Sequence, residues 1–150
     1  MNDTAYHQAA AQLETIETLM FALEVDYYRL DELTEAAEEL TAEAREELAD
    51  LKAAANGCRN DDDALQAIHE HPLCVEVRSG WRAQGEDLDP EEFCITLCTG
   101  GPAVRIMGEL DHRGEPGRAW LEFQDWGTPW THFSGGGDVL VRFASHFIIT

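Results

Sequence analysis

The sequence predicts an α+β protein in which an N-terminal long helix or helical hairpin precedes a four-stranded antiparallel β-meander with a short C-terminal helix. Two changes of pattern carry this prediction. Between Thr4 and Ala55 the chain has no Gly or Pro and is rich in Ala, Glu and Leu, the residues that favour helix most. After Pro72, short runs of alternating or mostly apolar residues are separated by turn residues, as in strands. We therefore expect an acidic, coiled-coil-like helical region at 1–57 and an α+β globular domain at 58–150.

The helical region carries an apolar seam that needs a partner. Its members recur at alternating spacings of three and four, the heptad pattern; they are Tyr6, Ala9, Leu13, Ile16, Met20, Leu23, Tyr27 and Leu30. The step to Leu33 repeats a spacing of three, a stammer that shifts the stripe around the helix. A single rod of about 52 residues would reach about 78 Å. We therefore expect either an antiparallel hairpin that turns near Leu40–Thr41, with Thr41 capping the second helix, or a homodimer through the N-terminal helix.

A short helix is expected between the helical region and the strands. Asn56-Gly57 is a typical helix end, and Asp61 or Asp62 is expected to cap a helix that runs through Ile68 and stops before Pro72.

Four strands are expected after this helix, at 74–78, 93–98, 103–110 and 119–123. Gly100-Gly101 is the tight turn between the second and third strands. Asp138 precedes apolar residues at helical spacing, which favours a short terminal helix. A fifth strand through 139–141 is the competing interpretation.

The net charge is strongly negative and unevenly distributed. Thirty acidic and ten basic residues give −20, of which residues 1–63 contribute −13 and residues 64–150 contribute −7. Such a field repels nucleic acid and anionic membranes and attracts basic surfaces. We therefore expect a basic protein as partner, with no direct nucleic-acid or membrane binding. The alternative is that the acidity serves solubility or reflects a salt-rich host, which the single Lys52 beside nine arginines fits as well.

No segment predicts export or membrane insertion. The chain has no run of about 18 apolar residues, and its N-terminus lacks the basic and apolar parts of a signal peptide. A cytoplasmic location is therefore expected. The four cysteines, Cys58, Cys74, Cys94 and Cys98, are interpreted as reduced packing residues.

A stripe of acidic residues is the first candidate partner-binding site. Its members recur every three or four residues; they are Glu32, Glu35, Glu39, Glu43, Glu46 and Asp50. On a continuous helix successive carboxylates would lie about 5 Å apart, and like charges at this spacing cost about 0.2–0.5 kcal/mol per pair. Such a row resembles the phosphates of DNA, which recur about every 3.4 Å along a strand. The alternative is an ordinary solvated helix face.

An aromatic loop is the second candidate. Asp125, Trp126 and Trp130 surround a Gly-Thr-Pro turn, and tryptophan is enriched at binding hot spots. The alternative is that both indoles fold over the sheet and close its core.

Metal binding and catalysis have weak support. His69, His71, Cys74, Cys94 and Cys98 lack the CxxC spacing of common zinc sites.

Cys98 with His112 or His132 as base and Asp125 as acid has no surrounding protease signature. The segment 99–102 lacks the Lys and Ser/Thr of a P-loop. We therefore expect no metal, no cofactor and no enzymatic activity.

A resemblance suggests a biological setting. Glu92–Asp111, with 118–122 and 124–130, resembles a family of small acidic proteins carried on conjugative elements, plasmids and phages of proteobacteria. The resemblance implies an anti-defence role, either anti-CRISPR or anti-restriction. Together with the acidity, it predicts a non-enzymatic DNA-mimic inhibitor of a CRISPR effector or restriction enzyme. The alternatives are a dimeric accessory interaction protein without a defence target, or a cysteine-dependent hydrolase.

Overall fold

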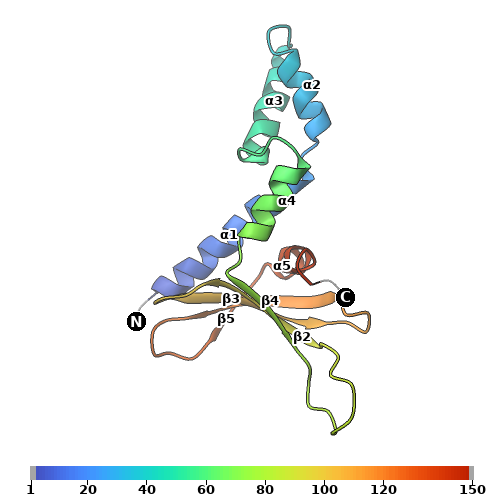
Figure 1. The fold of residues 1–150 in the computed structure, drawn as a ribbon. Helices are drawn as coiled ribbons and strands as arrows, with labels where there is room; N and C mark the ends of the chain where they lie inside the picture. The colour runs from blue at the N-terminus through green and yellow to red at the C-terminus, as the bar shows by residue number, and fades with distance from the viewer. Residues whose placement is uncertain (1–2, 149–150) are drawn as a thin grey trace.

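Five antiparallel strands form one sheet, and five helices lie on one side of it (Figure 1). The structure is a computed structural model that describes residues 3–148, and it confirms the α+β class. The helices are α1 (Thr4–Glu24), α2 (Tyr27–Glu35), α3 (Ala42–Ala55), α4 (Asp61–Glu70) and α5 (Gly137–Ala144). The strands are β1 (Cys74–Arg78), β2 (Glu92–Cys98), β3 (Ala103–Leu110), β4 (Pro116–Gln124) and β5 (Thr131–Phe133).

The sheet is a meander whose spatial order follows the chain, β1-β2-β3-β4-β5. The four predicted strands are confirmed as β1 to β4, and Gly100-Gly101 forms the β2–β3 turn with φ of 95° and 152°. The prediction of only four strands is wrong, because Thr131–Phe133 pairs with Leu121–Phe123 as β5. A strand of three residues is too short to show the alternation from which strands are recognised.

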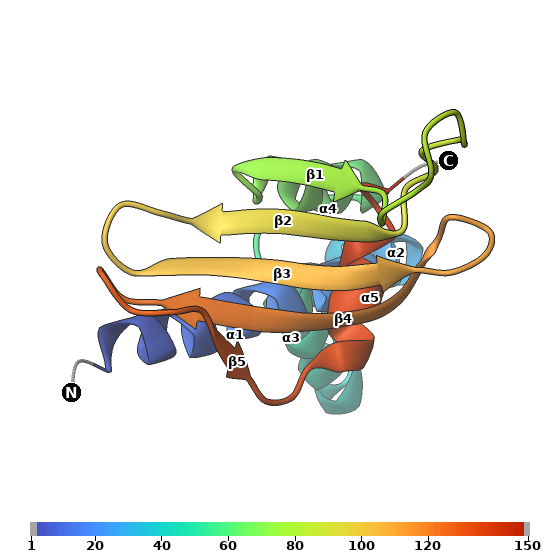
Figure 2. The ribbon, with the colours of Figure 1, turned by 90° about the horizontal axis from the view of Figure 1, so that it is seen from below.

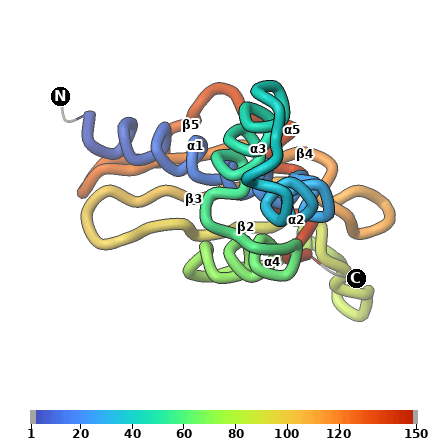
Figure 3. Tube along the Cα trace, turned by 90° about the horizontal axis from the view of Figure 1, so that it is seen from above, coloured from blue at the N-terminus to red at the C-terminus, as the bar shows by residue number. Residues whose placement is uncertain are grey.

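One face of the sheet is covered and the other is open. Figure 2, seen from below, has the strands in front of the helices, whereas Figure 3, seen from above, has the helices in front. Alternate strand residues point to the covered face, where α1, α4 and α5 bury them; they include Phe93, Ile95, Leu97, Val104, Ile106 and Leu121. The opposite residues remain partly solvated, as is common in antiparallel sheets.

The seam on the first helix finds its partner within the chain. Ala9, Ile16 and Met20 are buried in the core beneath the sheet, and α1 packs along β3 and β4. This burial accounts for the heptad pattern without a second copy of the helix. The homodimer through the N-terminal helix therefore stays an untested prediction. α1 shares the core of the sheet, and the division into 1–57 and 58–150 stays a prediction.

The expectation of one long helix, or of a simple two-helix hairpin, is corrected to three helices. α1 ends at Glu24, Val25 is extended with φ −63° and ψ 136°, and Asp26 caps α2. No Gly or Pro marks this break, so the sequence did not reveal it. The turn predicted near Leu40–Thr41 is confirmed, since Thr41 precedes α3 and its hydroxyl accepts a hydrogen bond from the Ala44 amide at 3.2 Å.

α2, the following turn and α3 project away from the sheet (Figure 1). We call residues 26–55 the arm. It has its own small apolar cluster, separate from the main core, in which Tyr27, Leu30, Leu33, Leu48 and Ala55 are buried.

Two shorter helices connect the arm and close the fold. Asn60, not Asp61 or Asp62, caps α4 by accepting a hydrogen bond from the Asp63 amide at 2.8 Å. Residues 139–141 belong to α5, so the predicted terminal helix is confirmed and the competing fifth strand there is wrong.

Candidate functional site

The start of α2 is held in place by two hydrogen bonds. The Asp26 carboxylate accepts a hydrogen bond from the Arg29 amide at 3.0 Å, and the buried Tyr27 hydroxyl donates to the Ala22 carbonyl at 2.6 Å. Burial, followed by the nearby Cys58 thiol, raises the pKa of Tyr27 to about 12. The Tyr27 hydrogen bond connects the start of the arm to the last turn of α1.

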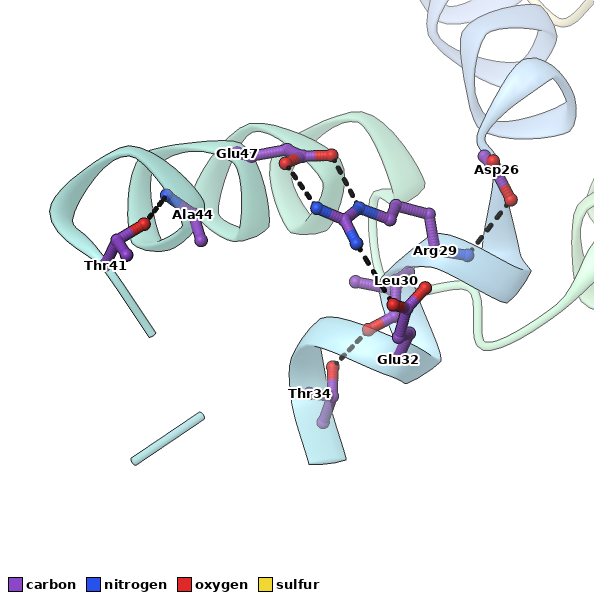
Figure 4. Close-up of polar contacts among 8 residues, drawn as sticks. All are labelled: Asp26, Arg29, Leu30, Glu32, Thr34, Thr41, Ala44 and Glu47. Atoms are coloured by element: carbon purple, nitrogen blue, oxygen red, sulfur yellow. Dashed lines mark hydrogen bonds and ion pairs between the residues drawn. The ribbon is translucent and has the colours of Figure 1, made fainter. Parts of the chain in front are cut away.

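Arg29 joins the two helices of the arm (Figure 4). Its Nε lies 2.9 Å from Glu47 Oε1 and its Nη2 lies 3.1 Å from Glu47 Oε2, so the pair is bidentate. A third nitrogen, Nη1, lies 3.3 Å from Glu32 Oε1. The hydrogen bonds from Arg29 hold the pKa of the Glu47 carboxyl below its usual range. One guanidinium thus serves two carboxylates, one on each helix.

Most acidic residues of the arm have no such partner. The arm has ten acidic and three basic residues, a net charge of −7, and all ten acids are exposed. Of the six predicted site residues, only Glu32 forms an ion pair within residues 3–148. The other five, Glu35, Glu39, Glu43, Glu46 and Asp50, project into solvent without a cation.

These carboxylates do not form the single row that a continuous helix would give. Glu32 and Glu35 lie on α2, Glu39 lies in the turn, and the remaining three lie on α3. Because α3 runs back past α2 (Figure 1), the acids are divided between two helices and the turn that joins them. Glu43, Glu46 and Asp50 share one side of α3, where with Glu47 they line a shallow hollow. Of the predicted stripe of six acids, only Glu43, Glu46 and Asp50 therefore lie in one row on one helix.

Six arginines outside the arm are paired with carboxylates: Arg59 with Asp63, Arg78 with Glu92, Arg82 with Glu91, Arg105 with Glu122, Arg118 with Glu109 and Arg142 with Glu24. The arm nevertheless has the higher charge density, with −7 over 30 residues against −13 over the other 120.

The aromatic loop lies on the open face of the sheet. Trp126 is 89% exposed, and the ring of Trp130 lies beneath the Arg105 guanidinium at 3.9 Å. Arg105 in turn binds Glu122 at 2.7 Å, and Trp120 Nε1 donates to the same carboxylate at 3.0 Å. The interpretation that both indoles close the core is wrong, because strand alternation places Arg105 and Glu122 on the face away from the helices.

Two hydrogen bonds between Asp125 and Thr128 close the turn of the aromatic loop. The Asp125 amide donates to the Thr128 hydroxyl at 3.0 Å, and the Asp125 carbonyl accepts from the Thr128 amide at 3.1 Å. With Arg105, the two indoles line a hollow of about 420 Å³. The arm and this loop are not brought together, because the sheet lies between them (Figure 1).

The predicted pair of Cys98 and His112 is not brought together. Burial raises the pKa values of the Cys94 and Cys98 thiols, which disfavours thiolate chemistry. Cys98 ends β2, whereas His112 follows β3 at the opposite end of the sheet. Within the described chain, no three His, Cys, Asp or Glu side chains lie close enough to hold a metal ion.

Sequence reasoning missed the loop at 79–91. Trp81 is fully exposed and Leu88 is 71% exposed, and both line a hollow of about 1080 Å³ between this loop and the loop after β3. A tryptophan between two glycines in a segment without periodicity was the available signal.

Comparison with family models, curated proteins and solved structures yields no match. No helix in the part of the chain that the structure describes is long and apolar enough to span a membrane.

Proposed function

We propose that the protein is a non-enzymatic inhibitor whose arm binds the basic nucleic-acid-binding surface of another protein. One observation supports this most: the arm carries a net charge of −7 over 30 residues, and five of its six predicted site carboxylates are exposed and form no ion pair among the described residues. Unpaired charge on a projecting element attracts an oppositely charged surface at long range. It also leaves the carboxylates free to bind arginine and lysine directly.

The target class follows from the spacing of these charges. Glu43, Glu46 and Asp50 lie three and four residues apart on α3, so successive carboxylates are about 5 Å apart along the axis. Duplex DNA presents one phosphate about every 3.4 Å along each strand, so this run offers a similar, more widely spaced series of negative charges to a groove that binds DNA. The resemblance to mobile-element proteins makes the partner a CRISPR effector or restriction enzyme in the host cytoplasm. In this proposal the aromatic loop adds specificity on the opposite side of the molecule.

The test is charge reversal on the arm. The arm variant has Lys at four acidic positions: Glu35, Glu39, Glu43 and Glu46. The control variant, called the loop variant, has Lys at Glu86, Asp87, Asp89 and Glu115. The second set is equally exposed and changes the net charge equally, but it lies in loops of the sheet region.

Protection is measured as the efficiency with which an unmodified plasmid transforms host cells that carry an active restriction or CRISPR system. The wild type and the loop variant should raise this efficiency, and the arm variant should not. Captured partners should be released by salt and by duplex DNA, since the contacts are ionic. Equal protection by all three proteins would exclude the arm from the mechanism.

A further inference from the structure

The edge strand β1 carries an unusual concentration of exposed apolar side chains. Of nine large apolar residues that are exposed within residues 3–148, five lie in the segment 73–88. We call them the apolar edge; they are Leu73, Val75, Val77, Trp81 and Leu88. All five residues of β1 are exposed. Figure 2 shows β1 as the outermost strand, with no strand beyond it. Exposed edges of this kind pair with other strands unless they are blocked.

The two valines continue the covered face of the sheet at its edge. Val75 lies opposite Ile95 and Val77 lies opposite Phe93, both of which are buried. Val75 and Val77 nevertheless remain 37% and 50% exposed. A strand added beside β1 would cover them and continue the core.

The charges on the other side of β1 are self-complementary. Glu76 and Arg78 both point to the open face and lie on either side of Val77. When two copies of β1 are placed antiparallel with Val77 opposite Val77, Glu76 of each copy lies opposite Arg78 of the other. Leu73 and Trp81 flank β1, four residues before and four residues after Val77, so both strand ends also carry exposed apolar groups. Opposite charges directly across an antiparallel pair are stabilising.

We propose that two copies of the protein associate through β1, forming one continuous sheet across a two-fold axis at Val77. The interface is isologous, since each copy offers the same strand. The arm does not take part, because α4 lies between β1 and the arm (Figure 1). The proposal is therefore independent of the arm's partner.

The register makes the test specific. Glu76→Arg places arginine opposite arginine, and Arg78→Glu places glutamate opposite glutamate, so each single variant should associate at least about tenfold more weakly than the wild type. The double variant E76R/R78E restores opposite charges and should associate again. A mixture of the two single variants should form a heterodimer, since each Arg then faces a Glu.

Association is measured by sedimentation over a range of protein concentrations, with circular dichroism to confirm that each variant is folded. Glu35→Arg and Arg45→Glu on the arm change the net charge equally and should leave the dimer unchanged. A wild type that stays monomeric at every concentration overturns the proposal. So does a dimer that both single variants retain, or one that neither the double variant nor the mixture restores.

Discussion

Arg29 on α2 donates two hydrogen bonds, of 2.9 and 3.1 Å, to the carboxylate of Glu47 on α3, a residue 18 positions later in the sequence. This bidentate geometry holds the two helices of the arm in a fixed relation. Arg29 also lies beside Glu32, so it compensates charge between the helices while leaving the carboxylates on the outside free. The same side chain therefore stabilises the arm and preserves its negative surface.

We predict that replacing Glu47 by Gln removes an acid-sensitive part of the arm's stability. The pKa of Glu47 is lowered in the folded protein, so its contribution is present above the ordinary value of about 4.5 and is lost as the pH falls through the folded value. The wild type and the variant should therefore differ most near neutral pH and converge in acid. Amide hydrogen exchange of α2 and α3 measures this.

Glu46→Gln is the matched control, since Glu46 is exposed and forms no ion pair within the described residues. A Glu47→Gln variant whose exchange matches that of Glu46→Gln at every pH would exclude the pair from a stabilising role.

We predict that Tyr27→Phe destabilises the protein by about 0.5–1.5 kcal/mol, the usual net contribution of one hydrogen bond. The Tyr27 hydroxyl is buried and donates to the Ala22 carbonyl, so the variant leaves that carbonyl without its partner. Urea denaturation followed by circular dichroism measures the loss. The variant should also lose the tyrosine ionisation near pH 12.

Tyr28→Phe serves as the comparison, because Tyr28 is 83% exposed. Its stability should stay within about 0.5 kcal/mol of the wild type. If the two variants were equally stable, the Tyr27 hydrogen bond would not anchor the arm.

The secondary structure was largely predictable from the sequence, but the break between α1 and α2 was not. The absence of Gly and Pro up to Ala55 correctly predicted helix, and the alternation after Pro72 correctly predicted four strands. The break at Val25–Asp26 was not predictable from helix propensity. It depends on a hydrogen bond between Tyr27 and Ala22, and on the burial of Val25 and Tyr27 in a separate cluster.

We predict that Gly108→Ala destabilises the protein by about 1–3 kcal/mol or more, the cost of overpacking a core. A Cβ at this position would overlap the Phe93 ring and meet the Arg118 carbonyl oxygen at 2.5 Å. The ring has no free space, since Phe93 is buried, and the carbonyl belongs to the neighbouring strand. Thermal or urea denaturation measures the effect.

Gly117→Ala is the matched control on the adjacent strand, since its Cβ would meet nothing nearer than 3.6 Å. Near-equal stability of the two alanine variants would contradict the close packing of Gly108 on Phe93.

The candidate sites were predicted less completely than the fold. The acidic residues were identified correctly as exposed, but their alignment depended on a helix that the structure breaks into α2 and α3. The aromatic loop was identified, but the partner of Trp130 was not, because Arg105 lies on a different strand. Contacts of this kind depend on strand register, which periodicity alone does not specify.

We predict that Arg105→Met destabilises the protein by about 1–3 kcal/mol, because it leaves the partly buried Glu122 carboxylate without its cation. It also removes the guanidinium from the Trp130 ring, so tryptophan fluorescence should change. Denaturation and the emission spectrum are measured together.

Arg118→Met is the control, because its ion pair with Glu109 is long, at 3.9 Å, and its side chain is 71% exposed. Exposed pairs contribute about 0–1 kcal/mol. Adding Glu122→Gln to Arg105→Met should recover part of the loss by removing the unpaired charge. A double variant no more stable than Arg105→Met would show that lost packing, not charge, accounts for the effect.

We predict that the protein loses stability as the pH falls below about 6.5 and that His71 contributes to this loss. Burial lowers the pKa of His71 below its ordinary value of 6.5. Its Nε2 lies 2.7 Å from Gln12 Oε1, and its ring packs edge-on to Phe143 at 6.2 Å between centroids. The unfolded chain therefore binds a proton at a higher pH than the folded one, so acid favours unfolding.

The pKa of His146 is lowered in the same way, by burial first and then by the nearby His69. The unfolding free energy measured by urea near pH 7.5 and near pH 5.5 should fall less for His71→Gln than for the wild type, and least for His71→Gln with His146→Gln. His112→Gln, in an exposed loop, should retain the wild-type dependence. A wild type whose stability is the same at both pH values would mean that neither half-buried ring resists protonation. The contacts of α4 and α5 with the core would then be insensitive to acid.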